Sequence, residues 1–289
     1  MSDFNPYQQP EADVLSVDLS ELEIHEGVHR PAGHAFQWVG DGWAIFSRQW
    51  VVWCTAAFLS LLISSAAGLV PFIGFIFQMV LSPVLSAGLL YMASRADKGE
   101  LVSVGNLFQA FQDGPGRLML FGLVFMLMVL AIVVITGLLA IPLLGPDFGA
   151  LMEAAQGQTP QAPSQMLMVK GLLLLGVYLL LLIPVLAAYW FALPLVYFAE
   201  AGIIRALVHS FFVCIRNFVS LFVYGLVLMF LFMGLLLAVG IVAAILGLLS
   251  EGIGIAVGFA MGFTMVFAMV ALMTTSWYAS FRDIFITPE

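Results

Sequence analysis

Hydrophobic residues dominate six stretches of the chain, and each is about as long as a helix that crosses a lipid bilayer. The hydrocarbon core of a bilayer takes roughly 20 consecutive apolar residues in α-helical form. Polar or turn-forming segments separate the six stretches. The pattern therefore predicts an all-α, polytopic membrane protein with six transmembrane helices, at residues 50–69, 72–93, 118–144, 166–199, 218–249 and 253–280.

The links between these spans differ in length. The dipeptide Val70-Pro71 separates the first two spans, and residues 250–252 separate the last two, so both pairs should form tight helical hairpins. The longest link, residues 145–165, is rich in proline and polar residues, which is typical of exposed coil.

The fourth span is longer than a simple crossing requires, because 34 residues make a helix of roughly 51 Å. Pro184 and Pro194 divide it. Proline removes a backbone donor and clashes with the preceding turn. We therefore expect a kink near Pro184 and an extension of the helix beyond the hydrocarbon, toward Glu200.

Three segments that precede a span are amphipathic instead of continuously apolar. Their large apolar residues recur at steps of three and four, with polar residues between them, as in helices that lie in a membrane interface. We call these segments elbow helices. Their predicted apolar stripes are Phe36, Val39, Trp43, Phe46 and Trp50 in the first, Leu101, Val104, Leu107, Phe108 and Phe111 in the second, and Ile204, Leu207, Val208, Phe211 and Ile215 in the third.

The first and third elbows also align in sequence. When Phe36 is placed on Ile204, residues 48–50 (Arg-Gln-Trp) fall on residues 216–218 (Arg-Asn-Phe). The middle copy is degenerate and has Gly-Pro-Gly-Arg at residues 114–117. This pattern favours three repeats of an elbow followed by a hairpin. The alternative is that loops between spans are commonly amphipathic without any repeat.

The composition of the chain is typical of an integral membrane protein. Of 289 residues, 63% are hydrophobic and 9% are charged, whereas soluble domains are roughly half apolar and a quarter charged. We therefore expect a transmembrane domain at residues 35–286. Residues 1–34 should form a largely disordered acidic tail.

The net charge of −8 is concentrated in that tail. Residues 1–29 hold seven carboxylates and no Lys or Arg. No basic patch is present to neutralise phosphates, which excludes nucleic acid as a partner. Anionic lipid would repel the tail, so it should project from the membrane, where a protein partner can bind it.

Positive charges predict the orientation. In the six-span arrangement Lys170 falls on one side, and the other Lys and Arg residues fall on the opposite side. This bias places the N- and C-termini in the cytoplasm. The first apolar stretch begins near Trp50, too late for a cleavable signal. The residues on the cytoplasmic side are Arg30, Arg48, Arg95, Lys98, Arg117, Arg205, Arg216 and Arg282.

Several segments together resemble a known family. They are the Pro-Phe-Ile-Gly turn at residues 71–74, the sequence SPVLSAGLLYMASRADKGE after it, and RALVHSFFVCIRNF before the fifth span. Over residues 34–285 the chain resembles uncharacterised six-span bacterial inner-membrane proteins, and more distantly the membrane domain fused to some glycerophosphoryl diester phosphodiesterases. The resemblance implies a multi-pass fold in the bacterial inner membrane. It carries over no catalytic residue, and the phosphodiesterase catalytic domain is missing.

No catalytic or cofactor chemistry emerges from the residues. Apart from Lys170 near the start of the fourth, the spans lack the charged side chains that proton-coupled transport requires, and their Ser and Thr residues have no His or Asp nearby to activate them. We therefore expect no enzymatic activity and no cofactor. The two cysteines, Cys54 and Cys214, should be buried hydrophobes.

Histidines are the remaining candidates for metal ligands. His25, His29 and His34 lie beside acidic residues, and His25 and His29 could share a helix face that binds a divalent metal. Gly27 and Pro31 disfavour that helix, so a solvated acidic segment is the preferred interpretation and no metal site is predicted. His209 should be an exposed or capped interfacial residue.

Glycines in the sixth span predict a helix contact. Gly254, Gly258 and Gly262 lie on one helix face, where small residues let two backbones approach closely. In the fifth span, Gly234 with Ala238 and Gly240 with Ala244 offer a matching surface. We favour a contact between the fifth and sixth spans of one chain, with self-association as the alternative.

Two functions fit these features. The first is a non-enzymatic assembly, scaffold or accessory subunit whose acidic tail binds a protein partner. The second is lipid binding or handling in a groove beside the elbow helices, in which Arg48, Arg205 and Arg216 contact lipid phosphate. Co-purified lipid would support the second function, and stoichiometric protein partners would support the first. The oligomeric state is open.

The charge bias generates a prediction about topology. A reporter fused after Gln158 should be active in the periplasm, and reporters fused after Lys98 or at the C-terminus should be active in the cytoplasm. Paired alkaline phosphatase and green fluorescent protein fusions measure both sides. A cytoplasmic signal after Gln158 would contradict the six-span arrangement.

Overall fold

A computed structural model describes residues 24–69, 73–145, 149 and 165–286. Every regular element within these residues is helical, which confirms the all-α class for this part of the chain. Residues 1–23 and most of the long link after residue 145 lie outside the described residues, so the predictions for the acidic tail and the exposed coil are not addressed there.

The long helices follow the apolar stretches closely. Five of them are long and apolar enough to cross a membrane, and the described part of the chain has six such segments if one bent helix pair is counted as a span. The protein is therefore a multi-pass membrane protein. The long helices are α2 (Trp50–Gly68), α3 (Ile73–Asp97), α5 (Gly116–Leu144), α7 (Gln165–Phe198), α9 (Phe218–Leu249) and α10 (Glu251–Phe285).

Helix α7 continues through both of its prolines. Pro184 and Pro194 lie inside the one helix, which ends at Phe198, close to the end expected from the sequence. The kink expected near Pro184 stays a prediction.

Short helices precede three of the long ones. Helices α1 and α2 are bent by 99° relative to each other, at a break of one residue, Gln49. Helix α8 leads in the same way into α9. The short helices are α1 (His34–Arg48), the 3₁₀ helix η2 (Val104–Phe108), α4 (Gln109–Gln112) and α8 (Ile203–Arg216).

The middle elbow differs from the prediction of one amphipathic helix over residues 101–111. The side chains of Ser103 and Asn106 form a capping box that starts η2 at Val104. Leu101 therefore lies outside the helix, and it is 84% exposed instead of forming part of an apolar stripe. The buried residues of the middle elbow are Val102, Leu107 and Ala110.

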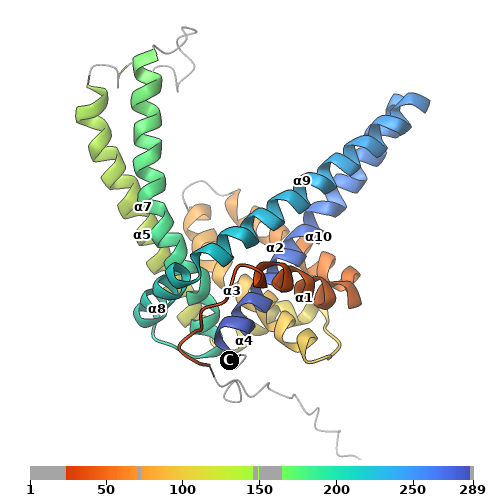
Figure 1. Cartoon of the computed structure of the whole chain (residues 1–289), viewed down its shortest axis with the longest axis horizontal. Helices are drawn as coiled ribbons and strands as arrows, with labels where there is room; N and C mark the ends of the chain where they lie inside the picture. The colour runs from red at the N-terminus through yellow and green to blue at the C-terminus, as the bar shows by residue number, and fades with distance from the viewer. Residues whose placement is uncertain (1–23, 70–72, 146–148, 150–164, 287–289) are drawn as a thin grey trace, which may run out of the picture.

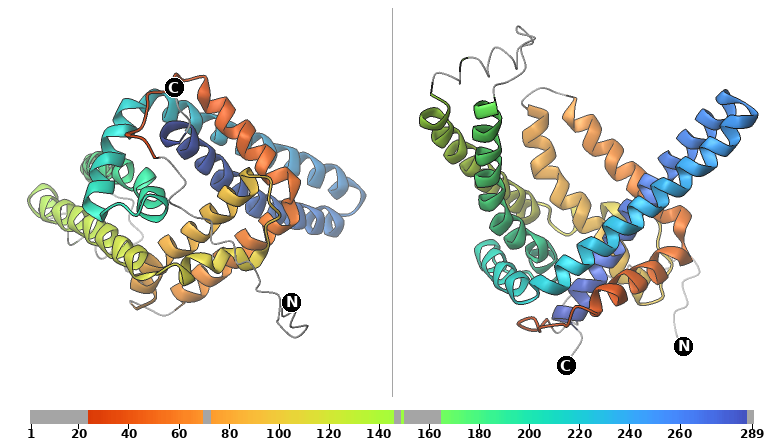
Figure 2. Two further views of the ribbon diagram at one scale, coloured as in Figure 1. Left: turned by 90° about the horizontal axis from the view of Figure 1, so that it is seen from below. Right: turned by 45° about the horizontal axis from the view of Figure 1, so that its top comes forward.

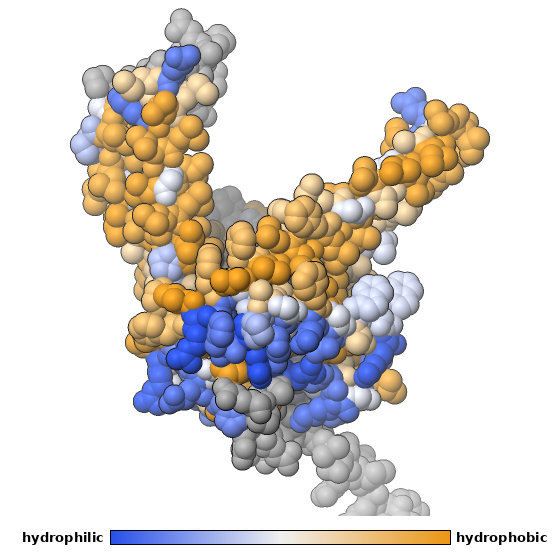
Figure 3. Space-filling model, in the orientation of Figure 1, coloured by the Kyte–Doolittle hydropathy of each residue, from blue (hydrophilic) through white to orange (hydrophobic). Residues whose placement is uncertain are grey.

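The helices form two diverging arms on a common base (Figure 1). Helices α5 and α7 make one arm, and α9 and α10 make the other, while the α2–α3 hairpin lies between and behind them (Figure 2). The arms are apolar and the base is hydrophilic (Figure 3). This division indicates that the arms lie in the bilayer and that the base faces water. We call the space between the two arms the notch.

Each short helix packs in the base across a long helix. Helices η2 and α4 pack on α3, α8 packs on α7, and α1 packs on α10 from the opposite end of the chain. Two of the crossings depend on glycine: a Cβ atom added to Gly42 would lie 2.6 Å from the backbone of Ser276, and one added to Gly88 would lie 1.8 Å from the carbonyl oxygen of Leu107. The short helices therefore press directly against the backbones below them.

The predicted apolar stripes are mostly the outward faces of these helices. In α1, Phe36 and Trp43 are more than half exposed, while Trp38 is buried. In α8, Ile204, Val208 and Ile215 of the predicted stripe point outward, and its Leu207 is buried. The inward faces escaped prediction in part, because they also contain small residues that give no apolar signal in the sequence. They comprise Ala35, Trp38, Gly42, Ile45 and Phe46 in α1, and Ala206, Leu207, Ser210, Val213 and Cys214 in α8.

Two of the three glycines in the predicted row lie at the α9–α10 contact. A Cβ atom on Gly254 would lie 2.6 Å from the Cα atom of Gly247 and 2.7 Å from the carbonyl oxygen of Ala243. A Cβ atom on Gly258 would lie 2.9 Å from the Cβ atom of Ala243, whereas one on Gly262 would meet nothing within 4 Å. The close contact therefore joins α9 and α10 of one chain, and the two helices are farther apart at Gly262.

The matching surface on α9 was placed wrongly. The sequence suggested Gly234 and Gly240 as its glycines, but a Cβ atom on either would have open space around it. Ala243 and Gly247 make the contact instead. The tight turn at Ser250 decides this register, because it brings the nearest turns of the two helices together.

This contact generates a prediction about stability. Gly254→Ala should lower the thermal stability of the detergent-solubilised protein, because overpacking a close contact costs about 1–3 kcal/mol. Gly262→Ala is the matched control, since it adds the same atom to the same helix in open space. Equal melting temperatures for the two variants would show that the α9–α10 contact contributes nothing to stability.

Candidate functional site

The first described residues form an extended strap across the base. The strap comprises residues 24–33, ahead of the domain boundary expected at residue 35. The backbone N–H of His25 donates to the carbonyl oxygen of Phe285 at 2.8 Å, and that of Val28 donates to Ile284 at 3.0 Å. These first described residues therefore bind the end of α10 through their backbone.

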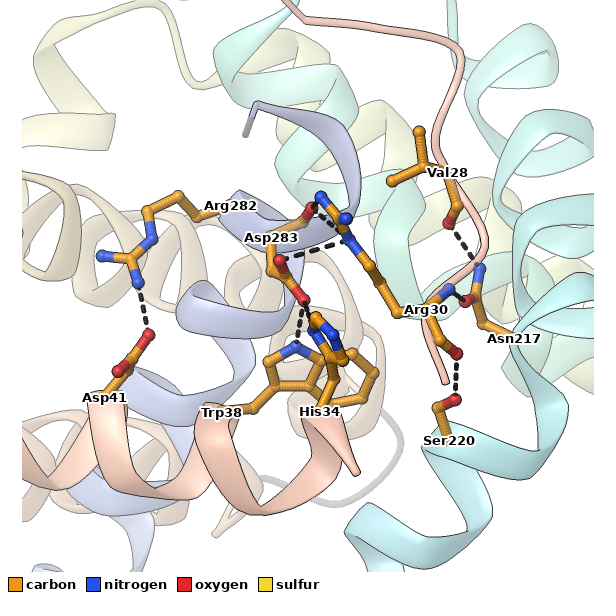
Figure 4. A network of polar contacts seen from close by, with 9 residues as sticks. All are labelled: Val28, Arg30, His34, Trp38, Asp41, Asn217, Ser220, Arg282 and Asp283. Carbon is orange, nitrogen blue, oxygen red and sulfur yellow. Dashed lines mark hydrogen bonds and ion pairs between the residues drawn. The ribbon is translucent and has the colours of Figure 1, made fainter. Parts of the chain in front are cut away.

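Asn217 clamps the backbone of the strap. Its Oδ1 accepts the N–H of Arg30 at 2.8 Å, and its Nδ2 donates to the carbonyl oxygen of Val28 at 3.0 Å (Figure 4). The hydroxyl of Ser220 donates to the carbonyl oxygen of Arg30 at 2.5 Å. Asn217 is fully buried. A buried amide whose donor and acceptor are both satisfied fixes the strap in one register.

Asp283 joins the strap and α1 to α10. One of its carboxylate oxygens accepts the indole N–H of Trp38 and bonds Nδ1 of His34, both at 2.8 Å, and the other lies 3.2 Å from Nε of Arg30 (Figure 4). The neighbouring Arg282 pairs with Asp41 of α1 at 2.5 Å and also with Asp97 of α3. These charges hold helices together, which is a structural role.

Gln49 performs the same task between the first hairpin and the middle elbow. Its Oε1 accepts the N–H of Val102 at 2.9 Å, and its Nε2 donates to the carbonyl oxygen of Val102 at 3.3 Å. Gln49 is the residue that aligns with Asn217 in the sequence. Where the end of α7 meets the residue that follows α4, the hydroxyl of Tyr197 donates to Asp113 at 2.7 Å.

A cavity of about 340 Å³ lies where the strap meets α8. Its lining residues are Glu26, His209, Phe212, Val213 and Arg216. His209 donates through Nε2 to the carbonyl oxygen of Glu26 at 2.7 Å. Arg216 donates one guanidinium N–H to the carbonyl oxygen of Gly27 at 3.2 Å. The cavity therefore carries a cationic and an anionic side chain at its wall.

The structure divides the three predicted arginines between two helices. Arg205 and Arg216 are exposed on α8, and Arg48 is exposed at the end of α1 that meets α2. Arg216 alone of the three lines the cavity. Beside Arg205 and Arg216, α8 presents an outward face of large apolar side chains, namely Ile204, Val208, Phe212 and Ile215.

Aromatic side chains close the lower end of the notch. Trp190 of α7 lies 6.4 Å from Tyr224 of α9 and 5.9 Å from Trp277 of α10, measured between ring centroids. The indole N–H of Trp190 is buried and has no hydrogen-bond partner among the described residues. Above this cluster the arms separate (Figure 3). Helix α8 connects the lower ends of the two walls, α7 and α9.

Two of the three N-terminal histidines bind separate partners through their rings. His29 bonds through Nδ1 to the carbonyl oxygen of Arg216 at 2.9 Å, and His34 bonds to Asp283. His25 and His29 lie in the extended strap, so they do not share a helix face. The described residues hold no group of three or more His, Cys, Asp or Glu side chains that could bind a metal.

Cys214 is buried on the inner face of α8. Burial raises the pKa of its thiol to about 12, although a hydrogen bond with Ser210 lowers it. The thiol is therefore protonated at neutral pH and unreactive, as a small hydrophobic residue would be.

The most important polar residues of the base left weak signals in the sequence. Asn217 was marked by its alignment with Gln49, but nothing in the pattern specified what the two amides bind. Asp283 had no signal beyond being charged, and Glu26 was one carboxylate among the many of the N-terminal tail. Contacts between residues about 250 positions apart have no local signature.

The chain matches no protein-family model, no curated protein and no solved structure. The fold and the site are therefore interpreted from the residues of the chain itself.

The Asn217 clamp generates a prediction about the strap. Asn217→Ala should destabilise the protein by about 1–3 kcal/mol, because it leaves the N–H of Arg30 and the carbonyl group of Val28 without partners. Hydrogen exchange at residues 26–31 should accelerate. Gln37→Ala, which removes an exposed amide from α1, is the control. Unchanged exchange in the strap of the Asn217 variant would contradict the clamp.

Proposed function

We propose that this is a non-enzymatic membrane protein that binds lipid laterally, with acyl chains in the notch and the headgroup at α8. The observation that carries the proposal is the notch itself, whose apolar walls rise from a hydrophilic base (Figure 3). Each part of this site corresponds to one part of a phospholipid.

The walls of the notch suit acyl chains. Residues 171–199 and 217–250, which cover nearly all of the two wall helices, contain no Asp, Glu, Lys, Arg or His. Helix α2 packs along α10, and α5 packs along α3, but α7 and α9 meet only near Trp190 and Tyr224 in the described structure. Above that point the facing sides of the walls need an apolar cover, which lipid chains supply in a bilayer.

The lower end of the notch suits a phosphate group. Arg205 and Arg216 are exposed on α8, beside its outward apolar face. A guanidinium group binds phosphate through two parallel hydrogen bonds and stays charged at any physiological pH. Arg48, at the end of α1, provides a comparable contact on another helix.

The membrane orientation and the repeat belong to the same proposal. The base carries most of the Lys and Arg residues, so the bias of positive charge supports a cytoplasmic base, and the bacterial inner membrane is the location that the family resemblance implies. Gln49 and Asn217 each clamp the segment that leads into an elbow, and each elbow packs across a long helix. These shared features support three elbow–hairpin repeats, with the strap joining the last to the first.

A second candidate function is an assembly or accessory subunit. The observation that favours it is the strap, which is fixed to the base and is continuous with the acidic residues 1–23. A basic surface on a partner protein would be attracted to such a segment. This function predicts a protein that co-purifies in fixed ratio and is lost when residues 1–20 are deleted.

Lipid photo-cross-linking tests the first candidate. Protein purified in mild detergent from membranes that contain a diazirine-labelled phospholipid should retain lipid, and its adducts should concentrate at residues 179–190 of α7 and 224–235 of α9. Helix α5 is the internal control, because it is also apolar and exposed but packs along α3. Adducts spread evenly over α5, α7 and α9, or no retained lipid, would contradict a lipid site in the notch.

A further inference from the structure

We infer that the cavity between the strap and α8 selects a phospholipid whose headgroup carries a primary ammonium, with the phosphate on Arg216 and the ammonium on Glu26. This inference rests on the proposed lipid-binding function and adds a headgroup class to it. Such a headgroup is a zwitterion, in which two carbons separate the negative phosphate from the positive ammonium.

Arg216 is suited to the phosphate. It is exposed at the C-terminal end of α8, immediately before α9 begins. One of its five N–H groups donates to the carbonyl oxygen of Gly27, and this bond orients the guanidinium while leaving other donors for a ligand. The strap therefore holds Arg216 in place without neutralising its charge.

Glu26 is suited to the ammonium. Glu26 is an exposed residue that lines the same cavity, and its carbonyl oxygen accepts the bond from His209. Among the described residues no ion pair joins its carboxylate to Arg216, although both line the cavity. An acidic and a basic residue that line one cavity without pairing offer separate positions to the two charges of a zwitterion.

The spacing of these two charges is set by rigid backbone. Gly27 has φ = +81°, a conformation that favours glycine, and a Cβ atom there would lie 3.0 Å from Val213 and 3.1 Å from Phe285. His209, which bonds Glu26, also packs edge-on against the ring of Phe285 at 5.6 Å. The strap is thus fixed against α8 and α10 on both sides of Glu26.

Phe212 connects the cavity to the apolar surface. It lines the cavity, and it is 62% exposed on the outward face of α8. A headgroup in the cavity would therefore have its glycerol and acyl portions beside an aromatic ring at the boundary between the base and the arms. The headgroup would therefore bind at the outer edge of the base and not in its interior.

The selectivity follows from hydrogen bonding to Glu26. A primary ammonium donates N–H groups to the carboxylate, and hydrogen bonds between charged groups are among the strongest in proteins. A choline headgroup has methyl groups in place of those donors. A glycerol headgroup has no positive charge and leaves the carboxylate of Glu26 facing an anionic lipid. Phosphatidylethanolamine should bind best of the three.

A competition among lipids with identical chains tests this inference. The full chain in detergent is mixed with equal amounts of phosphatidylethanolamine, phosphatidylcholine and phosphatidylglycerol, and the bound species are counted by native mass spectrometry. We expect the wild type to retain phosphatidylethanolamine about tenfold over the other two, a preference that corresponds to about 1.4 kcal/mol. Retention should fall across the mono-, di- and trimethylated headgroups, most sharply at the trimethylated one.

Matched variants assign the roles. Glu26→Gln should abolish the preference for phosphatidylethanolamine over the other two lipids without unfolding the protein, because the fold uses the backbone oxygen of Glu26. Arg216→Gln should reduce the retention of all three lipids. Glu200→Gln is the control, since Glu200 is an exposed carboxylate that pairs with Arg117. Glu200→Gln should keep the wild-type preference.

The outcomes separate the inference from the function on which it rests. Equal retention of the three lipids by the wild type, or an unchanged preference in Glu26→Gln, would overturn the headgroup assignment while lipid binding stands. No retained lipid in the wild type would overturn lipid binding itself. Soluble phosphoethanolamine should not displace the bound lipid at millimolar concentration, and displacement would assign the cavity to a free metabolite instead of a lipid.

Discussion

The base of the protein depends on two adjacent charged residues at the end of the last helix. Arg282 reaches Asp41 of α1 and Asp97 of α3, while Asp283 holds Arg30 of the strap and two side chains of α1. These side chains are partly withdrawn from water. Removing one member of such a network leaves an uncompensated charge, which is far more costly than losing an exposed ion pair. The relative positions of α1, α3 and α10 follow from this network.

The arms obey a different physical rule, because lipid surrounds them. Between helices in a bilayer there is no hydrophobic driving force, so association requires close packing or polar contacts. Helices α9 and α10 meet this requirement at Gly254 and Gly247, where backbone touches backbone. Glycines on α7 and on the facing stretch of α9, such as Gly176 and Gly234, have open space around them instead. The notch exists because the two wall helices have nothing that draws them together above the aromatic cluster.

The sequence predicted the elements better than their contacts. The spans were readable because long apolar stretches have no other stable place than a bilayer, and α9 begins and ends where the pattern placed it. The inward faces of α1 and α8 were predicted only in part, because some of their residues, such as Gly42 and Ser210, are small and carry no apolar signature. The strap was missed for a related reason: an extended segment held through its backbone has no side-chain periodicity. The register of α9 against α10 depended on the turn at Ser250, and several pairs of small residues fitted the motif equally well.

In the strap, the backbone makes most of the contacts with the base, and this leaves a side chain available for the candidate site. The protein holds residues 26–30 mainly through their N–H and carbonyl groups, which Asn217, His209 and Arg216 bind. The side chain of Glu26 is therefore not needed for the fold, and this exposed residue lines the cavity. Helix α8 is divided in the same way, with small residues inward against α7 and arginines and large apolar residues outward. Because the inner contacts of the strap and α8 are already satisfied, the opposite charges and the exposed ring at their outer edge remain for a ligand that has both a polar head and an apolar body.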